Sequence, residues 1–428
     1  MSSASGTSPL AQRDFRLLFG GSTVSAIGDQ FTLVALPWLV LKLTGSPAAL
    51  GLVLATMALP RAAFMLIGGA VVDRLSPRRV LLAARAANAL LVSLLAALVL
   101  GGAVHMWQVY VLALGIGLAT AFAYPAGSAM LPQLVPPAQL RPANALFMAM
   151  RQLSMLVGPA LAGLLIGTGA HGAHGGVADA TGLGLAFVVD ALSFVFSLIS
   201  LAMIRVHGDR HPRVSDGGVL ANVSAGIRAV WADLPLRAFV LYAAVVSVFV
   251  GGPIQVGLPM LADTRLDLGA ASLGILMTAN GGGMLVGSML SGIAAKLVGN
   301  RLGLMVLGID SLAGLALAAL GLDHSTLTGA ALLATTGILG GIVQVTIVSW
   351  IQHRVAPEMM GRTMSLLMFT FMGLGPLSAA VAGSLLKLIS LPALFAGAGL
   401  MLSAIALSCM VSPALRSIGT PRRAPAAG

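Results

Sequence analysis

The chain has 428 residues, of which 58% are hydrophobic and only 9% are charged. A soluble domain of this length needs a more highly charged surface, so the composition excludes a water-soluble globular protein and predicts membrane-spanning helices. The net charge is +11, but the basic residues lie in short loops between apolar runs, as in membrane proteins rather than nucleic-acid-binding proteins. The single cysteine, Cys409, excludes an intramolecular disulfide and a cysteine metal cluster.

Twelve apolar runs follow one another along the chain, and each can cross a bilayer because about 20 helical residues span the hydrocarbon core. The polar segment 1–14 lacks a cleavable signal pattern, so the first run is expected to act as the insertion signal. The sequence therefore predicts an all-α membrane protein with twelve transmembrane helices. The predicted spans are 15–41, 47–72, 79–103, 106–131, 143–168, 183–204, 237–261, 269–296, 301–322, 327–352, 362–389 and 391–411.

The longest polar stretch, 205–236, lies between the sixth and seventh spans and divides the chain into two halves. Within it, Leu220, Ile227 and Trp231 belong to an apolar series at helical spacing. This series predicts an amphipathic helix that either lies in the membrane interface or packs against the protein's own loops. The predicted parts are a cytoplasmic tail 1–14, a six-helix bundle 15–204, a cytoplasmic linker 205–236, a second six-helix bundle 237–411 and a cytoplasmic tail 412–428.

The basic residues predict the orientation of the spans. With the N-terminus in the cytoplasm, nineteen of the 24 lysines and arginines fall on the cytoplasmic side, Arg85 among them, and only Lys42, Arg265 and Lys387 fall outside. Arg61 and Arg151 lie within spans. The positive-inside bias therefore predicts a multi-pass protein of the bacterial inner membrane with both termini in the cytoplasm.

The two halves share short motifs in the same order, which indicates duplication. The loop after the second span carries one acid and three arginines, and a weaker copy follows the eighth span. Gly158 and Pro159 likewise correspond to Gly375 and Pro376, 217 residues later. Two parallel six-helix repeats are the architecture of a large class of transporters. The residues of the first loop motif are Gly69, Asp73, Arg74, Arg78 and Arg79, and those of the second copy are Gly292, Lys296, Gly299 and Arg301.

Asp29 and Arg61 lie near the middle of the first two spans, where an ionisable group costs about 2.5–3.5 kcal/mol and is a functional candidate by default. The two antiparallel spans place them at similar depth, which predicts a close or water-bridged pair. Proton uptake at Asp29 would then free Arg61 for an anionic substrate. Alternatively, the pair only holds the two helices together.

Three further ionisable groups lie within spans. Arg151 in the fifth span either faces the cavity or the seam between the halves, or extends to the cytoplasmic surface. Asp190 begins a stripe of serines on the sixth span and is a candidate for proton coupling or for hydrogen-bonded packing. Asp310 in the ninth span has the same two interpretations, with Gln344 as the partner at the best-matching depth.

Several of these motifs resemble the major facilitator superfamily. Its loop motif is Gly-x-x-x-Asp-Arg-x-Gly-x-Arg-Arg, which the first loop matches except that Ser76 replaces the second glycine. Further stretches resemble the bacterial branch of drug:proton antiporters that holds macrolide efflux proteins and the enterobactin exporter. They include Gly28 with Asp29, Leu36 with Pro37, Asn144 before Arg151, Asp190 to Phe194, and the motif Gly158, Pro159 and Gly163 of the fifth span.

The resemblance implies roles for particular residues. Asp73 would meet the end of the eleventh helix when the cytoplasmic side is closed, so the loop residues would form a conformational latch between outward-open and inward-open states. Alternatively, their charges only anchor the loop at the interface. Lys296 replaces the acid in the second copy, so this copy is expected to latch weakly or differently. The cavity candidates that the family's architecture implies are Gln30, Trp38, Tyr124, Gln255, Gln344 and Trp350, together with Arg151.

The sequence differs from many drug:proton antiporters at a position linked to proton coupling. Many drug:proton antiporters of the superfamily have an arginine in the fourth helix, whereas the span 106–131 has no charged residue. The proton relay of those relatives therefore does not carry over, and Asp29 is the preferred carboxylate. Small residues around Gly158 and Gly163 also permit close packing, which is the simpler explanation of that motif.

The sequence thus predicts a secondary active exporter of amphipathic small molecules that works by proton antiport and alternating access. The alternatives are a proton-coupled importer of a small nutrient and a transport-inactive membrane scaffold or sensor. The expected partners are a small-molecule substrate, protons and membrane lipids, with no nucleic acid, and the chain is expected to act as a monomer. No enzymatic activity, cofactor or metal site is expected, and the pair His171 and His174 is a weak metal candidate.

Overall fold

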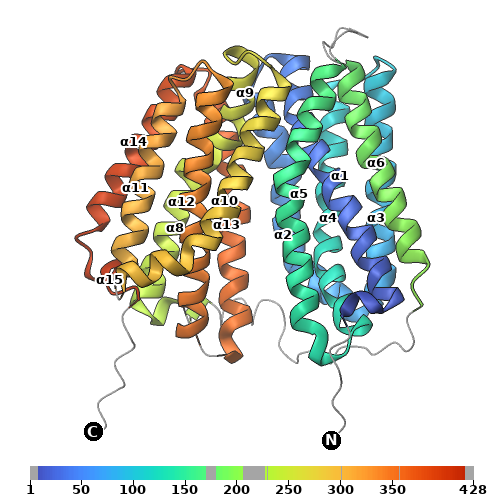
Figure 1. Cartoon of the computed structure of the whole chain (residues 1–428). Coiled ribbons are helices and arrows are strands. Elements are labelled where there is room, and N and C mark those ends of the chain that lie inside the picture. Colours follow the sequence, from blue (N-terminus) through green and yellow to red (C-terminus); the bar gives the residue numbers. More distant parts are fainter. Residues whose placement is uncertain are drawn as a thin grey trace, which may run out of the picture. The chain divides into compact units, whose positions relative to one another are not determined.

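The computed structural model describes residues 8–169, 180–205, 227–228, 230–299, 301–355 and 357–419. These residues form helices joined by short turns (Figure 1). Within the described ranges, eleven helical spans are long and apolar enough to cross a membrane, and a twelfth helix contributes the shorter apolar stretch Gly373–Leu385. The predicted class, an all-α membrane protein with twelve transmembrane helices, is confirmed.

The observed helices agree with the predicted spans to within a few residues at most ends. In the first half they are α1 (Arg13–Thr44), α2 (Pro47–Arg74), α3 (Pro77–Leu100), α4 (Met106–Leu134), α5 (Leu140–Thr168) and α6 (Ala180–Ala202), with short 3-10 turns η1 (Pro9–Ala11) and η2 (Pro137–Gln139). In the second half they are α8 (Leu234–Gly252), η3 (Pro253–Gly257), α9 (Leu258–Thr264), α10 (Ala270–Val298), α11 (Leu302–Leu320), α12 (Thr326–Arg354), α13 (Pro357–Leu385), α14 (Leu391–Cys409) and α15 (Pro413–Arg416).

The chain divides into two compact units. The first comprises Met1–Asp216 and Leu268–Thr278, and the second comprises Gly217–Asp267 and Ala279–Gly428. In the first unit α1 packs on α5 and α6, and α3 packs on α4 and α6. In the second unit α8 packs on α13 and α14, and α11 packs on α12 and α14. The same helix pairs of each predicted repeat therefore pack together, as expected for a duplicated chain.

The seventh span, predicted as one helix, is continuous from Leu234 to Thr264 but contains a local change of helix type. Pro253 lacks a backbone N–H, and the residues from Pro253 to Gly257 form a π-helical turn between α8 and α9. The hydroxyl of Ser378 on α13 accepts a hydrogen bond from the Gly252 backbone N–H at 2.8 Å and donates one to the Val248 carbonyl. The side chain from α13 thus satisfies backbone groups at the point where the helix changes its geometry.

Glycines set the approach of α10 and α12 in the second unit. A Cβ at Gly283 would lie 2.2 Å from the Ala334 carbonyl oxygen, and one at Gly341 would lie 2.3 Å from that of Met284. Such distances are possible only without a side chain, so these glycines fix a crossing in which the two backbones touch.

Candidate functional site

Asp29 is a carboxylate near the middle of α1 that lies deep among the atoms of the protein, where burial disfavours its charge, although its side chain keeps an exposed surface. Two cations act on it, Arg85 from α3 most strongly and Arg61 from α2 second. Among the described side chains, neither cation comes within the 4.0 Å of a direct ion pair to Asp29. Asp29 therefore interacts electrostatically with Arg61 as the sequence suggested, but Arg85 is the stronger neighbour.

Asp190 on α6 is a second carboxylate of this cluster, and it is held differently. It is only 1% exposed. Thr32 Oγ1 donates a hydrogen bond to Asp190 Oδ2 at 2.5 Å, and Ser193 Oγ donates to Oδ1 at 3.3 Å. Asp190 also interacts electrostatically with Asp29 and Arg85. The bond from Thr32 ties α1 to α6, and Ser193 holds the carboxylate from within α6, so a packing role is the interpretation that the geometry favours for Asp190.

Gly28 allows this close contact between α1 and α6. A Cβ at position 28 would lie 2.0 Å from Ser193 Oγ and 2.8 Å from Asp190 Oδ1. A side chain would therefore displace the groups that hold Asp190. Gly28 thus lets Asp190 stay buried against α1, while Asp29, the next residue after Gly28, remains accessible.

Arg85 is the residue of this cluster that the sequence analysis missed, because it was counted with the cytoplasmic cations. It lies eight residues into α3, or about 12 Å along the helix axis. Its Nη1 donates a hydrogen bond to Ser25 Oγ on α1, and its guanidinium lies over the ring of Phe194, 5.5 Å from the centroid. Its Nε is buried without a hydrogen-bond partner among the described residues. Arg85 therefore belongs to the interior of the first unit.

Arg151 on α5 extends the cluster toward α4. It is exposed, and its guanidinium lies 6.0 Å from the ring centroid of Tyr124, which is 55% exposed. Arg151 also repels Arg61 electrostatically. Arg151 is thus linked to Asp29 through Arg61, and Arg61, Arg151 and Tyr124 all belong to the set predicted from the sequence.

The other cavity candidates of the first unit are involved in packing. A Cβ at Gly158 would lie 2.4 Å from Gln30 Cγ, so this motif glycine makes room for Gln30. Trp38 is 2% exposed, with the Lys42 ammonium 5.0 Å from its ring centroid. A Cβ at Gly163 would lie 2.7 Å from the Ala270 carbonyl oxygen, which belongs to the same unit. Gly158 and Gly163 thus permit close helix packing, as the simpler interpretation predicts.

In the second unit, Gln255 lies in the π-helical turn η3, where helices of other proteins often carry functional residues. It faces Gly375 of α13, where an added Cβ would be 2.9 Å from Gln255 Nε2. Gln344 on α12 is exposed. Trp350 is 7% exposed and packs on Phe239, so it belongs to the core of this unit.

Asp310 on α11 has a different partner from the one expected. The hydroxyl of Tyr242 on α8 donates a hydrogen bond to Asp310 Oδ2 at 2.7 Å, whereas the sequence analysis matched Asp310 with Gln344. The depth of Asp310 in the membrane does not predict its pairing with Tyr242, because this pairing depends on which faces of α8 and α11 meet.

The predicted latch is described only in part. Gly69, Asp73 and Arg74 lie on α2, but their side chains are outside the described part of the structure. Arg78 donates to the carbonyls of Leu201, at 3.5 Å, and Ala202, at 2.8 Å. The motif therefore ties the start of α3 to the end of α6. The remaining motif cations, which are all exposed, are Arg79, Lys296 and Arg301.

Two sequence predictions fall outside the described residues. His171 and His174 lie within 170–179, and most of the predicted amphipathic helix lies within 206–226. Within the residues that the structure describes, no group of three or more histidines, cysteines and acids is placed to hold a metal ion.

The arrangement of the cluster permits one kind of chemistry. Asp29 and Asp190 together balance the charges of Arg61 and Arg85 when both acids are ionised. A proton added at the accessible Asp29 would leave an uncompensated positive charge beside Arg151. Binding of a proton by this cluster would therefore change its net charge within the first unit.

Comparison with known proteins identifies the family. The sequence pattern of the Major Facilitator Superfamily matches residues 18–380, and the chain belongs to this superfamily. The chain is 27% identical over 416 residues to the multidrug efflux pump Tap of Mycobacterium tuberculosis, covering 94% of each chain. It is 28% identical over 360 residues to the enterobactin exporter EntS of Escherichia coli, covering 81% of this chain and 79% of EntS.

A third relative is the macrolide efflux protein A of Streptococcus pyogenes, which is 25% identical over 281 residues, covering 65% of this chain and 66% of the relative. The resemblance to the branch that holds macrolide efflux proteins and the enterobactin exporter is thereby confirmed.

Proposed function

We propose that this protein is a secondary active exporter of amphipathic small molecules, such as drugs, macrolide-like compounds or siderophore-like compounds. The three relatives named above are described as pumps or exporters of such molecules, which supports the direction and the substrate class. The proposal places the chain in the bacterial inner membrane as a monomer with both termini in the cytoplasm. It acts as a transporter and not as an enzyme.

The proposal rests on the different surroundings of two carboxylates, Asp29 and Asp190, in the first unit. Asp190 is buried and hydrogen-bonded, whereas Asp29 is accessible and lies in the field of Arg85 and Arg61. An acid in the middle of a span that only served packing would be expected to be buried and bonded, as Asp190 is. Asp29 is therefore the group that takes up the proton in this proposal.

The energy of one proton is sufficient for useful export. At a membrane potential of roughly 150 mV, one charge moving inward releases about 3.5 kcal/mol. That energy sustains a concentration ratio of a few hundredfold, since about 1.4 kcal/mol corresponds to a factor of ten. A single accessible carboxylate per transport cycle is therefore enough.

The proposed cycle uses the residues of the first unit in order. Substrate enters from the cytoplasm or the inner leaflet and meets Arg151 and Tyr124. Proton uptake at Asp29 weakens its hold on Arg85 and Arg61, and this change of charge favours one state of the transporter over the other. The loop that contains Asp73 then closes the cytoplasmic side as a latch.

The alternatives make different use of the same fold. A proton-coupled importer of a small polar nutrient would need more hydrogen-bonding groups than the candidate set provides. A transport-inactive scaffold or sensor would need no titrating carboxylate. The accessible position of Asp29 favours transport over the second alternative.

The test is an accumulation and toxicity screen in an efflux-deficient bacterium. Wild type is compared with Asp29→Asn, which removes the proton site, and Asp73→Asn, which removes the latch acid. Asp267→Asn serves as the matched control, because Asp267 is an exposed acid outside the helices. Wild type and the control are expected to expel at least one amphipathic compound, and both other variants are expected to lose this ability. The proposal is wrong if Asp29→Asn and Asp73→Asn expel every compound as well as wild type does.

A further inference from the structure

We propose that the second unit binds the phosphate-bearing headgroup of an anionic phospholipid in a cavity between α10, α11 and α12. This site is separate from the charged cluster of the first unit and does not depend on the direction of transport. It involves the second copy of the loop motif, which the proposed transport cycle does not use.

The cavity has a volume of about 370 Å³, which is within the range of small-ligand sites. It lies beyond the close crossing of α10 and α12 at Gly283 and Gly341, toward the C-terminal ends of both helices. Small residues on α10 leave the space open, since a Cβ at Gly292 would meet nothing within 4 Å. The lining residues are Ser291, Gly292, Ala295, Leu302, Val345, Thr346, Ser349, Trp350, His353, Arg354 and Gly419.

An unsatisfied hydroxyl in the wall points to a polar ligand. Thr346 is 5% exposed, and its Oγ1 is buried without a hydrogen-bond partner among the described residues. A buried hydroxyl that makes no hydrogen bond costs free energy, so such groups normally have a partner. Ser349 lies three residues later on the same helix and also lines the cavity. The Thr346 Oγ1 itself is covered by protein, so it would reach an anion only after rotation about the Cα–Cβ bond, whereas the exposed Ser349 can donate to an anion directly.

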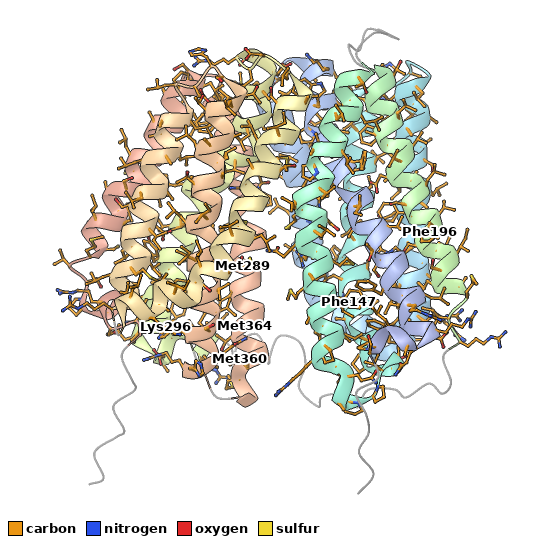
Figure 2. All side chains as sticks on the ribbon, viewed as in Figure 1. Phe147, Phe196, Met289, Lys296, Met360 and Met364 are labelled. Atoms are coloured by element: carbon orange, nitrogen blue, oxygen red, sulfur yellow. The ribbon has the colours of Figure 1, made fainter. Side chains whose placement is uncertain are left out.

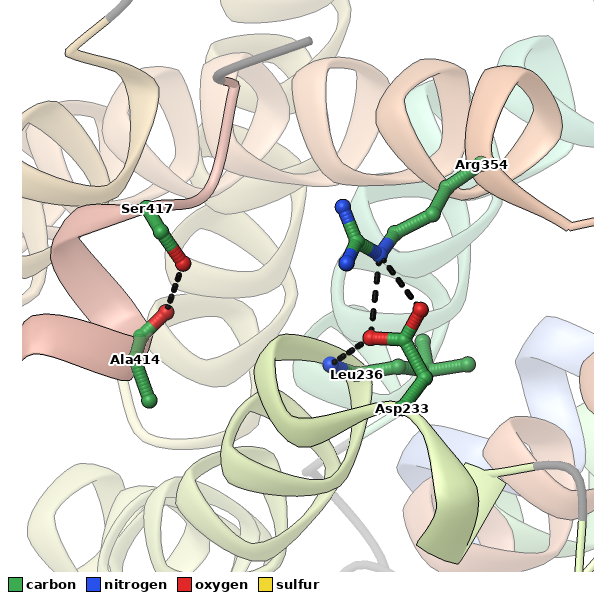
Figure 3. A network of polar contacts seen from close by, with 5 residues as sticks. All are labelled: Asp233, Leu236, Arg354, Ala414 and Ser417. Atoms are coloured by element: carbon green, nitrogen blue, oxygen red, sulfur yellow. Dashed lines mark hydrogen bonds and ion pairs between the residues drawn. The ribbon is translucent and has the colours of Figure 1, made fainter. Parts of the chain in front are cut away.

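The charged residues that line the cavity favour an anionic ligand. Its lining contains Arg354 and His353 but no acid. Arg354 Nε donates to both carboxylate oxygens of Asp233, at 2.8 and 3.0 Å. Figure 3 shows that this ion pair uses Nε, which leaves the two terminal guanidinium nitrogens out of the pair, and the guanidinium lies over the ring of Trp350, 5.5 Å from its centroid. Arginine nitrogens of this kind are suited to phosphate oxygens.

The loop motif adds two more cations. Lys296 follows the lining residue Ala295, and Arg301 precedes the lining residue Leu302, and both are exposed. The first copy of the motif has Asp73 where this copy has Lys296, so the charge at this position is reversed between the repeats. Both cations are thus next in sequence to residues of the wall, and a motif copy with two cations and no acid favours an anionic ligand over the carboxylate contact proposed for the first copy.

The apolar part of the wall favours a lipid over a free anion. Trp350, Val345 and Leu302 line the cavity together with the hydroxyls. The ends of α10 and α12 are also the predicted cytoplasmic ends of their spans, which is the depth at which lipid phosphates lie. A phosphodiester with an attached glycerol and acyl chains contacts both kinds of wall.

The experiment measures lipid binding to the full-length protein by native mass spectrometry. Phosphatidylglycerol is titrated against phosphatidylcholine, which has the same glycerophosphate but no net charge, and against soluble glycerol 1-phosphate. Gly292→Leu fills the cavity, and Gly340→Leu on α12 is the matched control because a Cβ there also meets nothing within 4 Å. Lys296→Gln removes a cation, and Lys387→Gln is its control at another exposed lysine of the unit.

Phosphatidylglycerol is expected to bind more tightly than phosphatidylcholine to wild type and to both controls. Gly292→Leu is expected to abolish this preference. Lys296→Gln is expected to weaken phosphatidylglycerol binding by about tenfold, as for one charge-assisted contact. Equal binding of the two lipids, or equal binding by Gly292→Leu and Gly340→Leu, overturns the site. An unchanged affinity in Lys296→Gln overturns the role of the motif, and equally tight binding of glycerol 1-phosphate overturns the lipid as the ligand.

Discussion

The two units pack their helices in the same pairs, but their interiors differ in charge. In the first unit, Asp29, Asp190, Arg61 and Arg85 interact with one another within the spans. In the second, Asp310 lies within α11, and a neutral hydroxyl from Tyr242 is its partner. Packing therefore does not require the charged cluster, which is a reason to assign it a function.

Corresponding helices make the polar contact in both units. Arg85 on α3 bonds to Ser25 on α1, and Asp310 on α11 bonds to Tyr242 on α8. In the predicted repeats, α11 corresponds to α3 and α8 corresponds to α1. The same pair of helices thus carries a cation in one unit and an acid in the other, so the helix packing persisted while the chemistry diverged. The ion pair of the second unit, Arg354 with Asp233, lies at helix ends instead (Figure 3).

The largest expected effect on stability comes from removing Arg85. Arg85→Gln takes away the cation that acts most strongly on Asp29 and weakens the bond to Ser25, so unfolding is expected to cost about 3 kcal/mol less, as for a hydrogen bond to a charged group. Thermal unfolding in detergent measures this loss. Arg79→Gln is the control, since Arg79 is exposed on the same helix and should change stability by no more than about 0.5 kcal/mol. Equal stability of the two variants would contradict the assignment of Arg85 to the interior.

A smaller effect is expected at the contact between α1 and α6. Gly28→Ala places a methyl group 2.0 Å from Ser193 Oγ, and this overpacking is expected to destabilise the fold by about 2 kcal/mol. Gly20→Ala on the same helix meets nothing within 4 Å and should be close to neutral. Comparing the yields and melting temperatures of the two variants tests the contact, and a Gly28→Ala variant as stable as Gly20→Ala would show that α1 and α6 are not in close contact there.

The smallest effect is expected in the second unit. Tyr242→Phe removes one hydrogen bond to Asp310 and should cost about 1 kcal/mol, since such bonds between transmembrane helices are modest. Tyr110→Phe on α4 is the control. Transport is expected to continue in both variants, and its loss in Tyr242→Phe would place coupling chemistry in the second unit as well.

The helices could be predicted from the sequence because an apolar run of sufficient length is a local signal. The span predicted at 106–131 is observed as Met106–Leu134, and that at 269–296 as Ala270–Val298. The π-helical turn at Pro253 was not predicted, because a proline within a span is compatible with a helix whose freed backbone groups find other partners. Here the partner is Ser378, which is 126 residues from Gly252 in the chain.

The charged cluster could be predicted only in part. Asp29 and Arg61 were recognised because they interrupt apolar runs, as Figure 2 illustrates by the predominantly carbon side chains that cover the helices. Arg85 was missed because it lies only eight residues after Pro77, in a stretch that also contains the loop arginines Arg78 and Arg79. Its place inside the unit depends on which face of α3 meets α1 and α6, and a single sequence does not contain that information.

The most direct test of the account measures protons. Substrate identified in the screen is added to purified wild type, Asp29→Asn and Asp310→Asn in weakly buffered detergent, and proton release is recorded with a pH indicator. The account predicts release from wild type and from Asp310→Asn and none from Asp29→Asn. Release from Asp29→Asn equal to that from wild type would contradict the central claim that the accessible acid of the first unit carries the proton.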